Sequence, residues 1–214
     1  MTSRDTLHLS PRKTAKQERS RRKAEHILDT TLELLAEGEG DRITTKMIAA
    51  RAKISVGNLY QFYPNKEALY WDLFQRWMEQ IIAALDGLEE ELQAGGSPER
   101  FVDGILRVLG SNRAINSKGY WNLRGLMERS PELSAESWPF HHKLVARIAE
   151  LHTMCSAQPG EAPQEELKLL QNQVVMACLY VLSETPEGQK QAQVLGWSRQ
   201  IMLSAFSAGA ADKI

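Results

Sequence analysis

The side chains best suited to specific recognition lie within one short segment, SVGNLYQFY. Asn58 and Gln61 carry amides that both donate and accept hydrogen bonds, which is what contact with base edges requires. Tyr60 offers a hydroxyl group to a phosphate, and Lys66 follows shortly with a cation. Gly57 costs a helix about 1 kcal/mol relative to alanine, but it removes a side chain where backbone could approach a groove wall. The segment therefore predicts close contact with a nucleic acid.

Other kinds of site have weak support in the sequence. We find no phosphate-binding glycine loop, no nucleophile elbow and no repeated cluster of histidine and carboxylate, so we expect no enzyme activity. His141 and His142 are adjacent, and adjacent residues of a helix point about 100° apart. No Cys or carboxylate joins these histidines or His152 at a chelating spacing, so we expect neither a metal nor a cofactor. Cys155 and Cys178 lie in apolar surroundings, which indicates free buried thiols.

The charge of the chain is unevenly distributed. The net charge is −1, but residues 1–66 carry 13 Lys and Arg against 8 Asp and Glu, and the remainder carries 13 against 19. A basic N-terminal part joined to an acidic remainder is expected where one region meets a polyanion. No apolar run reaches the roughly 18 residues that span a bilayer, and no signal peptide is evident. We expect a cytoplasmic protein.

Apolar residues recur at helical spacing, and no stretch alternates for long enough to indicate a strand. We therefore predict an all-α fold of about nine helices. Residues 1–19 are predicted to form a flexible basic arm, followed by a helix that begins near Ser20. Thr44 and Ser55 are expected to cap two short helices.

Asn65 is expected to cap a long helix that ends near Gly95, and Ser97 caps the next one. Pro139 is predicted to break or to begin a helix. The remaining segments are expected as a helix over 118–129, a loop over 157–163, and two final helices over 164–184 and 187–208.

Two short helices joined by a tight turn, behind a third helix, form a helix-turn-helix arrangement. Apolar residues supply the inner faces of these helices: Ile43, Ile48, Ala49, Ala52, Ile54, Leu59 and Tyr63. Val56 and Phe62, with the polar residues of the second short helix, are expected to remain outside this core. The alternative is three small packed helices whose polar faces are only solvated.

The order of residues over about 20–70 resembles that of the TetR family of bacterial transcriptional regulators. The resemblance is carried by Thr44-Thr45, Ile48-Ala49, Ala52, Ile54-Ser55, Gly57, Leu59-Tyr60, Tyr63 and Lys66. It implies a DNA-binding domain over 20–66 and a helical ligand-binding and dimerisation domain over 67–214. Lys53 stands where the family usually has a turn glycine, and Phe62 stands where histidine is common.

The resemblance also implies which residues contact DNA. The expected contacts are Thr44, Thr45, Lys46, Ser55, Val56, Gly57, Asn58, Tyr60, Gln61, Phe62, Tyr63 and Lys66. Among these, Tyr60 and Lys66 are expected to hold phosphates. The last two helices would pair with a second copy, so that a homodimer reads a palindromic operator on double-stranded DNA.

Large aromatic residues in the C-terminal part could line an apolar cavity for a small-molecule effector. The candidate ligand-binding residues are Trp77, Ile81, Leu109, Tyr120, Trp121, Arg124, Met127 and Phe140. Ordinary core packing is the alternative for the aromatic residues, and a surface ion pair with Glu128 is the alternative for Arg124.

These features together predict a repressor that a small molecule releases from its operator. One alternative is a ligand-independent DNA-binding or nucleoid-associated factor that uses the same N-terminal helices. A helical enzyme or adaptor that only keeps a DNA-binding-like bundle is the other alternative.

Overall fold

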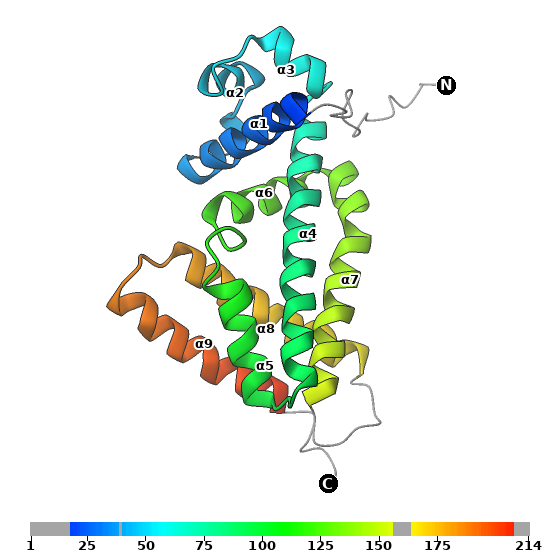
Figure 1. Cartoon of the computed structure of the whole chain (residues 1–214), viewed down its shortest axis with the longest axis vertical. Coiled ribbons are helices and arrows are strands. Elements are labelled where there is room, and N and C mark those ends of the chain that lie inside the picture. Colours follow the sequence, from blue (N-terminus) through cyan, green and yellow to red (C-terminus); the bar gives the residue numbers. More distant parts are fainter. Residues whose placement is uncertain (1–17, 39, 156–163, 208–214) are drawn as a thin grey trace. The chain divides into compact units, whose positions relative to one another are not determined.

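The computed structural model describes residues 18–38, 40–155 and 164–207, and in this part of the chain it contains helices and no strand (Figure 1). The predicted all-α fold is thus confirmed. The α-helices are α1 (Glu18–Glu37), α2 (Thr45–Arg51), α3 (Val56–Phe62), α4 (Lys66–Gln93), α5 (Pro98–Ile105), α6 (Lys118–Arg129), α7 (Pro131–Cys155), α8 (Glu165–Glu184) and α9 (Gln189–Ser207). Two short turns of other helix types, η1 (Gly40–Arg42) and η2 (Leu106–Gly110), complete the described elements.

The chain divides into two compact units, each of which is built from two stretches of sequence. One unit comprises Met1–Met78 and Lys118–Trp138, and the other comprises Glu79–Ser117 and Pro139–Ile214. The packing therefore does not divide at residue 66, where we expected the DNA-binding domain to end. The reason is that α6 packs with the N-terminal helices. Besides α1, α2 and α3, the first unit therefore includes η1, α6 and the first parts of α4 and α7.

The first unit is held together by the apolar face of α1. Ile27, Thr31 and Leu35 on this face are fully buried, as expected for residues that recur every three to four positions. A Cβ atom at Gly119 of α6 would lie 2.5 Å from the carbonyl oxygen of Leu32, so α1 and α6 come close only because this residue is glycine. The Asn122 side chain donates a hydrogen bond of 2.7 Å to the carbonyl oxygen of Leu35.

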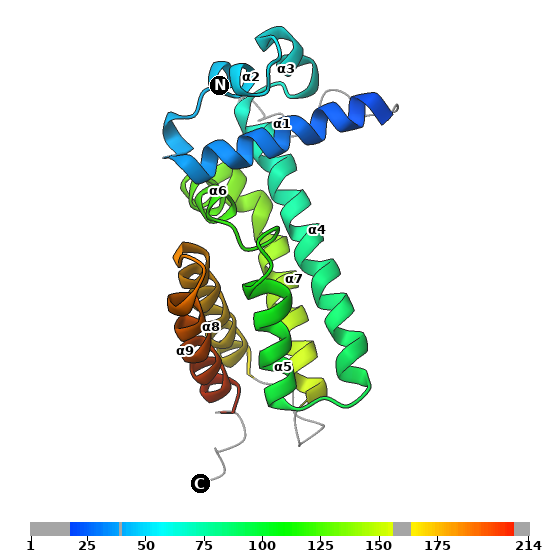
Figure 2. The same cartoon turned by 60° about the vertical axis from the view of Figure 1, so that its left-hand side comes forward.

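The second unit contains the side-by-side pair of helices α8 and α9 (Figure 2). Its core includes a cluster of three rings. The centre of the His152 ring of α7 lies 5.5 Å from the ring centre of Phe101 in α5 and 4.8 Å from that of Phe206 in α9. Burial lowers the pKa of His152, because an apolar site disfavours the charged imidazolium. Cys155 and Cys178 are free and buried, as predicted.

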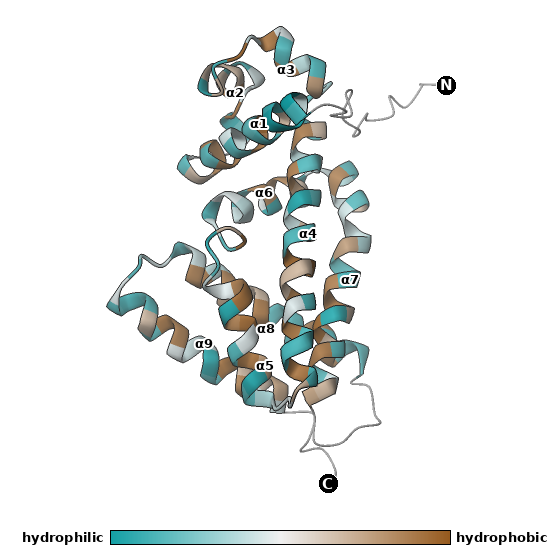
Figure 3. Cartoon of the chain, viewed as in Figure 1, coloured by the Kyte–Doolittle hydropathy of each residue, from teal (hydrophilic) through white to brown (hydrophobic). Residues whose placement is uncertain are grey.

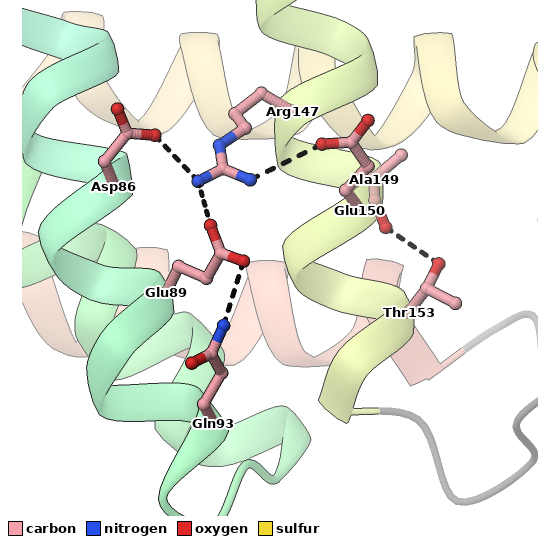
Figure 4. A network of polar contacts seen from close by, with 7 residues as sticks. All are labelled: Asp86, Glu89, Gln93, Arg147, Ala149, Glu150 and Thr153. Carbon is pink, nitrogen blue, oxygen red and sulfur yellow. Dashed lines mark hydrogen bonds and ion pairs between the residues drawn. The ribbon is translucent and has the colours of Figure 1, made fainter.

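One arginine connects two helices of the second unit (Figure 4). The Arg147 guanidinium of α7 lies 2.7 Å from an Asp86 carboxylate oxygen of α4, and it also bonds Glu89 of α4. Glu150, three residues further along α7, lies at 3.5 Å. Only 17% of the Arg147 side chain is exposed. Its positive charge is therefore stabilised by these carboxylates to a greater extent than the charge of a fully solvated arginine would be.

The predicted helix starts agree with local hydrogen bonds. Asn65 accepts a bond of 2.7 Å from the Ala68 amide at the start of α4, and Ser97 accepts one of 3.2 Å from the Arg100 amide at the start of α5. The predicted break at Pro139 is wrong, because α7 runs through it without interruption. Pro139 and Ala135, whose carbonyl group loses its helical partner there, are both exposed, so water can satisfy that group.

The flexible basic arm expected over 1–19 lies outside the described residues, except that Glu18 and Arg19 begin α1. The loop expected over 157–163 also lies outside them. Helices α8 and α9 agree with the two final helices that we predicted, to within about two residues where their ends are described.

Candidate nucleic-acid interface

Helices α2 and α3 are both started by side-chain caps. The Thr44 hydroxyl accepts a hydrogen bond of 3.2 Å from the Met47 amide, and the Ser55 hydroxyl accepts one of 3.1 Å from the Asn58 amide. Such caps each contribute about 1 kcal/mol to a helix, and both were predicted from the sequence. Short helices of seven residues depend on them, because an isolated helix of this length is unstable in water.

The turn between α2 and α3 contains a residue in the left-handed conformation. Lys53 has a φ of 54°, as expected for a residue that replaces a turn glycine. The turn is closed by the Ile54 amide, which donates a bond of 2.9 Å to the carbonyl oxygen of Ala49. Small side chains at Ala49 and Ala52 are almost fully buried, which allows the two helices to cross closely.

Helix α2 is also connected to α1. The Arg51 guanidinium donates two hydrogen bonds of 2.8 Å to the Glu37 carboxylate at the end of α1. A ring nitrogen of His26 lies 3.2 Å from the carbonyl oxygen of Ala52. These contacts, together with the buried Ile48, fix the orientation of α2 on α1 and thereby the position of α3.

The solvent face of α3 has no charged side chain, because its sequence is VGNLYQF. Gly57 is exposed, and a Cβ atom built on it would meet no heavy atom of its surroundings within 4 Å. Packing inside the protein therefore does not explain the glycine. This observation agrees with the prediction that another molecule approaches the backbone there.

Hydrogen bonds organise the polar groups around Gly57. The Tyr60 hydroxyl of α3 lies 3.2 Å from the Thr45 hydroxyl of α2, so the two helices present these groups together. The side-chain amide nitrogen of Asn58 donates a hydrogen bond of 3.2 Å to the side-chain oxygen of Gln61. Lys46 is exposed at the start of α2, and Val56 is partly exposed at the start of α3.

Two expected contact residues lie in the core instead. Phe62 is 4% exposed, so the prediction that its side chain remains outside the core is wrong. The reason is the helical period, which places Phe62 on the same face as Leu59, three residues earlier. Tyr63 is 1% exposed, and its hydroxyl donates a bond of 2.6 Å to Asp72. Burial, and then the Asp72 carboxylate, raises the pKa of Tyr63, so it serves as a neutral core donor.

Lys66 lies in the first turn of α4, where we expected it to hold a phosphate. Its ammonium group donates a bond of 3.3 Å to the carbonyl oxygen of Ile43 and lies 5.6 Å from the centre of the Tyr70 ring. The side chain is partly exposed. These contacts hold the cation beside the segment that leads into α2, and the phosphate contact stays a prediction.

Met47 is 45% exposed on α2, although it is absent from the contacts expected from the sequence. Ile48 and Ala49 occupy the inner face, so the helical period places their neighbour outside. The sequence therefore already indicated an exposed Met47, because the two residues after it take the inward positions of this short helix.

Residues 27–72 match the family described as bacterial regulatory proteins, tetR family. The chain is also 33% identical over 98 residues to the HTH-type transcriptional repressor KstR of Mycolicibacterium smegmatis. The aligned region makes up 46% of this chain and 46% of that protein. The N-terminal part of the chain is thus similar to regulatory proteins of the TetR family. It spans less than half the length of the curated relatives that it matches.

Solved structures of TetR-family proteins share the fold. A regulator from Mesorhizobium loti aligns with a TM-score of 0.60 and 16% identity, over 90% of this chain and 98% of that chain. The regulator LfrR from Mycobacterium smegmatis, solved in complex with proflavine, aligns with a TM-score of 0.59 and 18% identity, over 87% and 97% of the two chains. At this level of identity the likeness shows the fold alone.

The candidate ligand-binding residues fall into both compact units. In the first unit, the Trp77 and Tyr120 rings stack with centroids 5.0 Å apart, and the Trp121 ring lies edge-on to Trp77 at 6.2 Å. The Arg124 guanidinium lies 5.6 Å from the centre of the Trp121 ring and bonds Glu128 at 2.7 Å. The ion pair that we gave as the alternative for Arg124 is therefore present.

The remaining members of the set are also placed by the structure. Met127 is buried in α6 of the first unit, while Ile81 and Leu109 are buried and Phe140 is partly exposed in the second unit. A ligand-binding role for the whole set stays a prediction. The second unit also has an open groove, which none of these residues lines: its walls are Leu88, Glu91, Leu92, Ala94, Arg100, Asp103, Gly104 and Arg107.

The described residues contain no group of three or more His, Cys, Asp or Glu that could hold a metal ion. Within the same residues, no helix is sufficiently long and apolar to cross a membrane.

Proposed function

We propose that the protein is a sequence-specific DNA-binding transcriptional regulator, a repressor that a small molecule releases from a palindromic operator. The observation that carries this proposal is the solvent face of α3. It is uncharged, it is positioned by α1 and α2, and it includes a glycine that the protein's own packing does not require. A face of this kind suits the major groove, where an α-helix fits and base edges can be distinguished.

The contacts that we propose for DNA are fewer than the sequence suggested. Thr44, Thr45, Lys46 and Met47 would approach from α2, and Ser55, Val56, Gly57 and Gln61 from α3. Tyr60 and Lys66 would hold phosphates. The Asn58 side chain bonds the neighbouring Gln61 side chain within this face of α3. Phe62 and Tyr63 support the helix from within the core and do not contact DNA through their side chains.

A homodimer would supply two such faces. On α8 and α9 a series of large apolar side chains is about half exposed: Leu169, Leu170, Tyr180, Val181, Trp197 and Ile201. Figure 3 shows apolar residues, in brown, along both helices. Exposed apolar surface of this extent is typical of an interface. Ser183 of α8 is buried within the chain, where its hydroxyl donates to the Tyr180 carbonyl oxygen.

Release by a ligand is supported by the relatives. KstR is a transcriptional repressor, and LfrR was crystallised with the small molecule proflavine. A ligand can shift the equilibrium only by its difference in affinity for the two states, typically about 1–3 kcal/mol. We infer that the protein is no enzyme and that it acts in the cytoplasm, where DNA is accessible.

The proposal is tested by selecting bound DNA from a random pool. The expected result is an enriched palindrome whose half-sites lie about one helical turn, roughly 34 Å, apart. Affinity for that DNA should fall steeply with salt, because phosphate contacts release counterions. Enrichment of no sequence would refute the proposal, and uniform binding to all DNA would favour a nucleoid-associated factor.

A ligand screen then separates a sensor from a ligand-independent factor. Apolar compounds are added and the melting temperature is measured, since a ligand that binds the folded state raises it. Compounds that raise it should also weaken binding to the selected DNA. Stabilisation without any effect on DNA binding would contradict the proposed release.

A further inference from the structure

Asn58 and Gln61 are three residues apart on α3, so their side chains are neighbours on one side of the helix. The side-chain amide nitrogen of Asn58 donates a hydrogen bond of 3.2 Å to the Gln61 side-chain oxygen. Asn58 is partly buried, whereas Gln61 is exposed. The oxygen of the Asn58 amide is inaccessible to solvent and accepts no bond from any described residue.

These facts give the two amides different roles. The Asn58 oxygen is hidden and one of its two side-chain N–H donors is engaged, so Asn58 has at most one donor left for a base. The bond from Asn58 fixes the orientation of the Gln61 amide, because its oxygen turns toward Asn58 and its NH₂ group therefore turns away. Of the other polar side chains of α3, the Tyr60 hydroxyl is engaged by Thr45. Gln61 thus presents the main free donor of this helix.

We propose that Asn58 is a positioning residue that holds Gln61 as a hydrogen-bond donor, and that Gln61 reads a guanine in the major groove. Guanine offers two adjacent acceptors there, O6 and N7. A freely rotating glutamine would instead suit adenine, because adenine needs a donor and an acceptor from the same amide. This inference rests on the proposed function and adds the base that one position of the operator must carry.

The test uses the full-length protein and selection of bound DNA from a random pool. Wild-type protein should enrich guanine at one position of each half-site, by about tenfold over the other bases. Gln61→Glu keeps the acceptor for Asn58 but removes both donors, so this position should change to cytosine, whose N4 amino group is a donor.

Asn58→Asp tests the positioning role. An aspartate can only accept, so it should turn the Gln61 amide around, and the same position should change from guanine to a base with a donor, adenine or cytosine. A merely structural role for Asn58 would lower affinity for all sequences and leave the preference unchanged. Gln93→Glu, the same chemical change at the exposed end of α4, is the control and should keep the guanine.

The outcomes separate the two claims. If wild-type protein enriches no sequence, both the proposed function and this inference fail. If it enriches a palindrome without guanine at such a position, or if Gln61→Glu keeps the guanine, only this inference fails. Melting curves of each variant show whether it is folded, and because Gln61 is exposed, Gln61→Glu decides the matter even if Asn58→Asp does not fold.

Discussion

The substitution Gly57→Ala should have opposite effects on stability and on DNA binding. Gly57 has no positive φ, and an added Cβ atom would meet no heavy atom of its surroundings within 4 Å. Alanine therefore fits the folded chain and gains the difference in helix propensity, which is about 1 kcal/mol. For a chain of this size, such a gain raises the melting temperature by about 2–4 °C.

DNA binding should weaken in the same variant. If the α3 backbone approaches the wall of the groove at Gly57, the new methyl group lies in that contact. Overfilling a close-packed contact by such a group costs about 1–3 kcal/mol, and 1.4 kcal/mol corresponds to a tenfold change in affinity. We therefore expect a loss of about tenfold in affinity from a protein that is more stable.

The assay combines thermal denaturation with fluorescence anisotropy on the selected DNA. Gly87→Ala is the matched control, because Gly87 is an exposed residue within α4 and its added Cβ also meets nothing within 4 Å. It should gain similar stability and bind DNA as the wild type does. The reasoning is refuted if Gly57→Ala binds DNA with unchanged affinity, or if it is less stable than the wild type.

Substitutions at three further positions, Lys53, Lys66 and His152, test other features of the structure. Lys53→Gly should raise the melting temperature by removing strain of about 1 kcal/mol at φ 54°, whereas Lys53→Ala keeps the Cβ atom and should not. Lys66→Ala should reduce the slope of log affinity against log salt by about 1, measured by anisotropy at several salt concentrations; an unchanged slope would remove Lys66 from phosphate binding. His152 has a lowered pKa in the folded state, so the unfolded chain binds more protons, and stability should fall as pH drops through the unfolded pKa of about 6.5 and onward to the folded value. His152→Gln should flatten this part of the stability curve, measured by denaturant unfolding from pH 7.5 to 5.

Features that depend on neighbouring residues could be predicted from the sequence. Thr44, Ser55 and Ser97 cap their helices as expected, because an N-cap bond involves only residues two or three positions away. The left-handed conformation of Lys53 agrees with the family resemblance, in which this residue replaces a turn glycine.

Features that depend on tertiary packing could not be predicted in this way. Pro139 lies within α7 because its position is exposed, and exposure is set by the elements that pack around the helix. The candidate ligand-binding residues are far apart in the sequence, so no local pattern states whether they enclose a cavity. Phe62 is an intermediate case: its distance of three residues from Leu59 placed it inward, but its position in the family pattern had suggested otherwise.

The close crossing of α1 and α6 makes Gly119 difficult to replace. A Cβ atom there would press on the carbonyl oxygen of Leu32, and a backbone atom has less freedom to move aside than the end of a side chain. Even a single methyl group at this position would act as a wedge between the two helices. Since Gly119 is remote in sequence from α2 and α3, such a wedge offers a way to disturb the support of the helix-turn-helix without altering any residue proposed to face the groove.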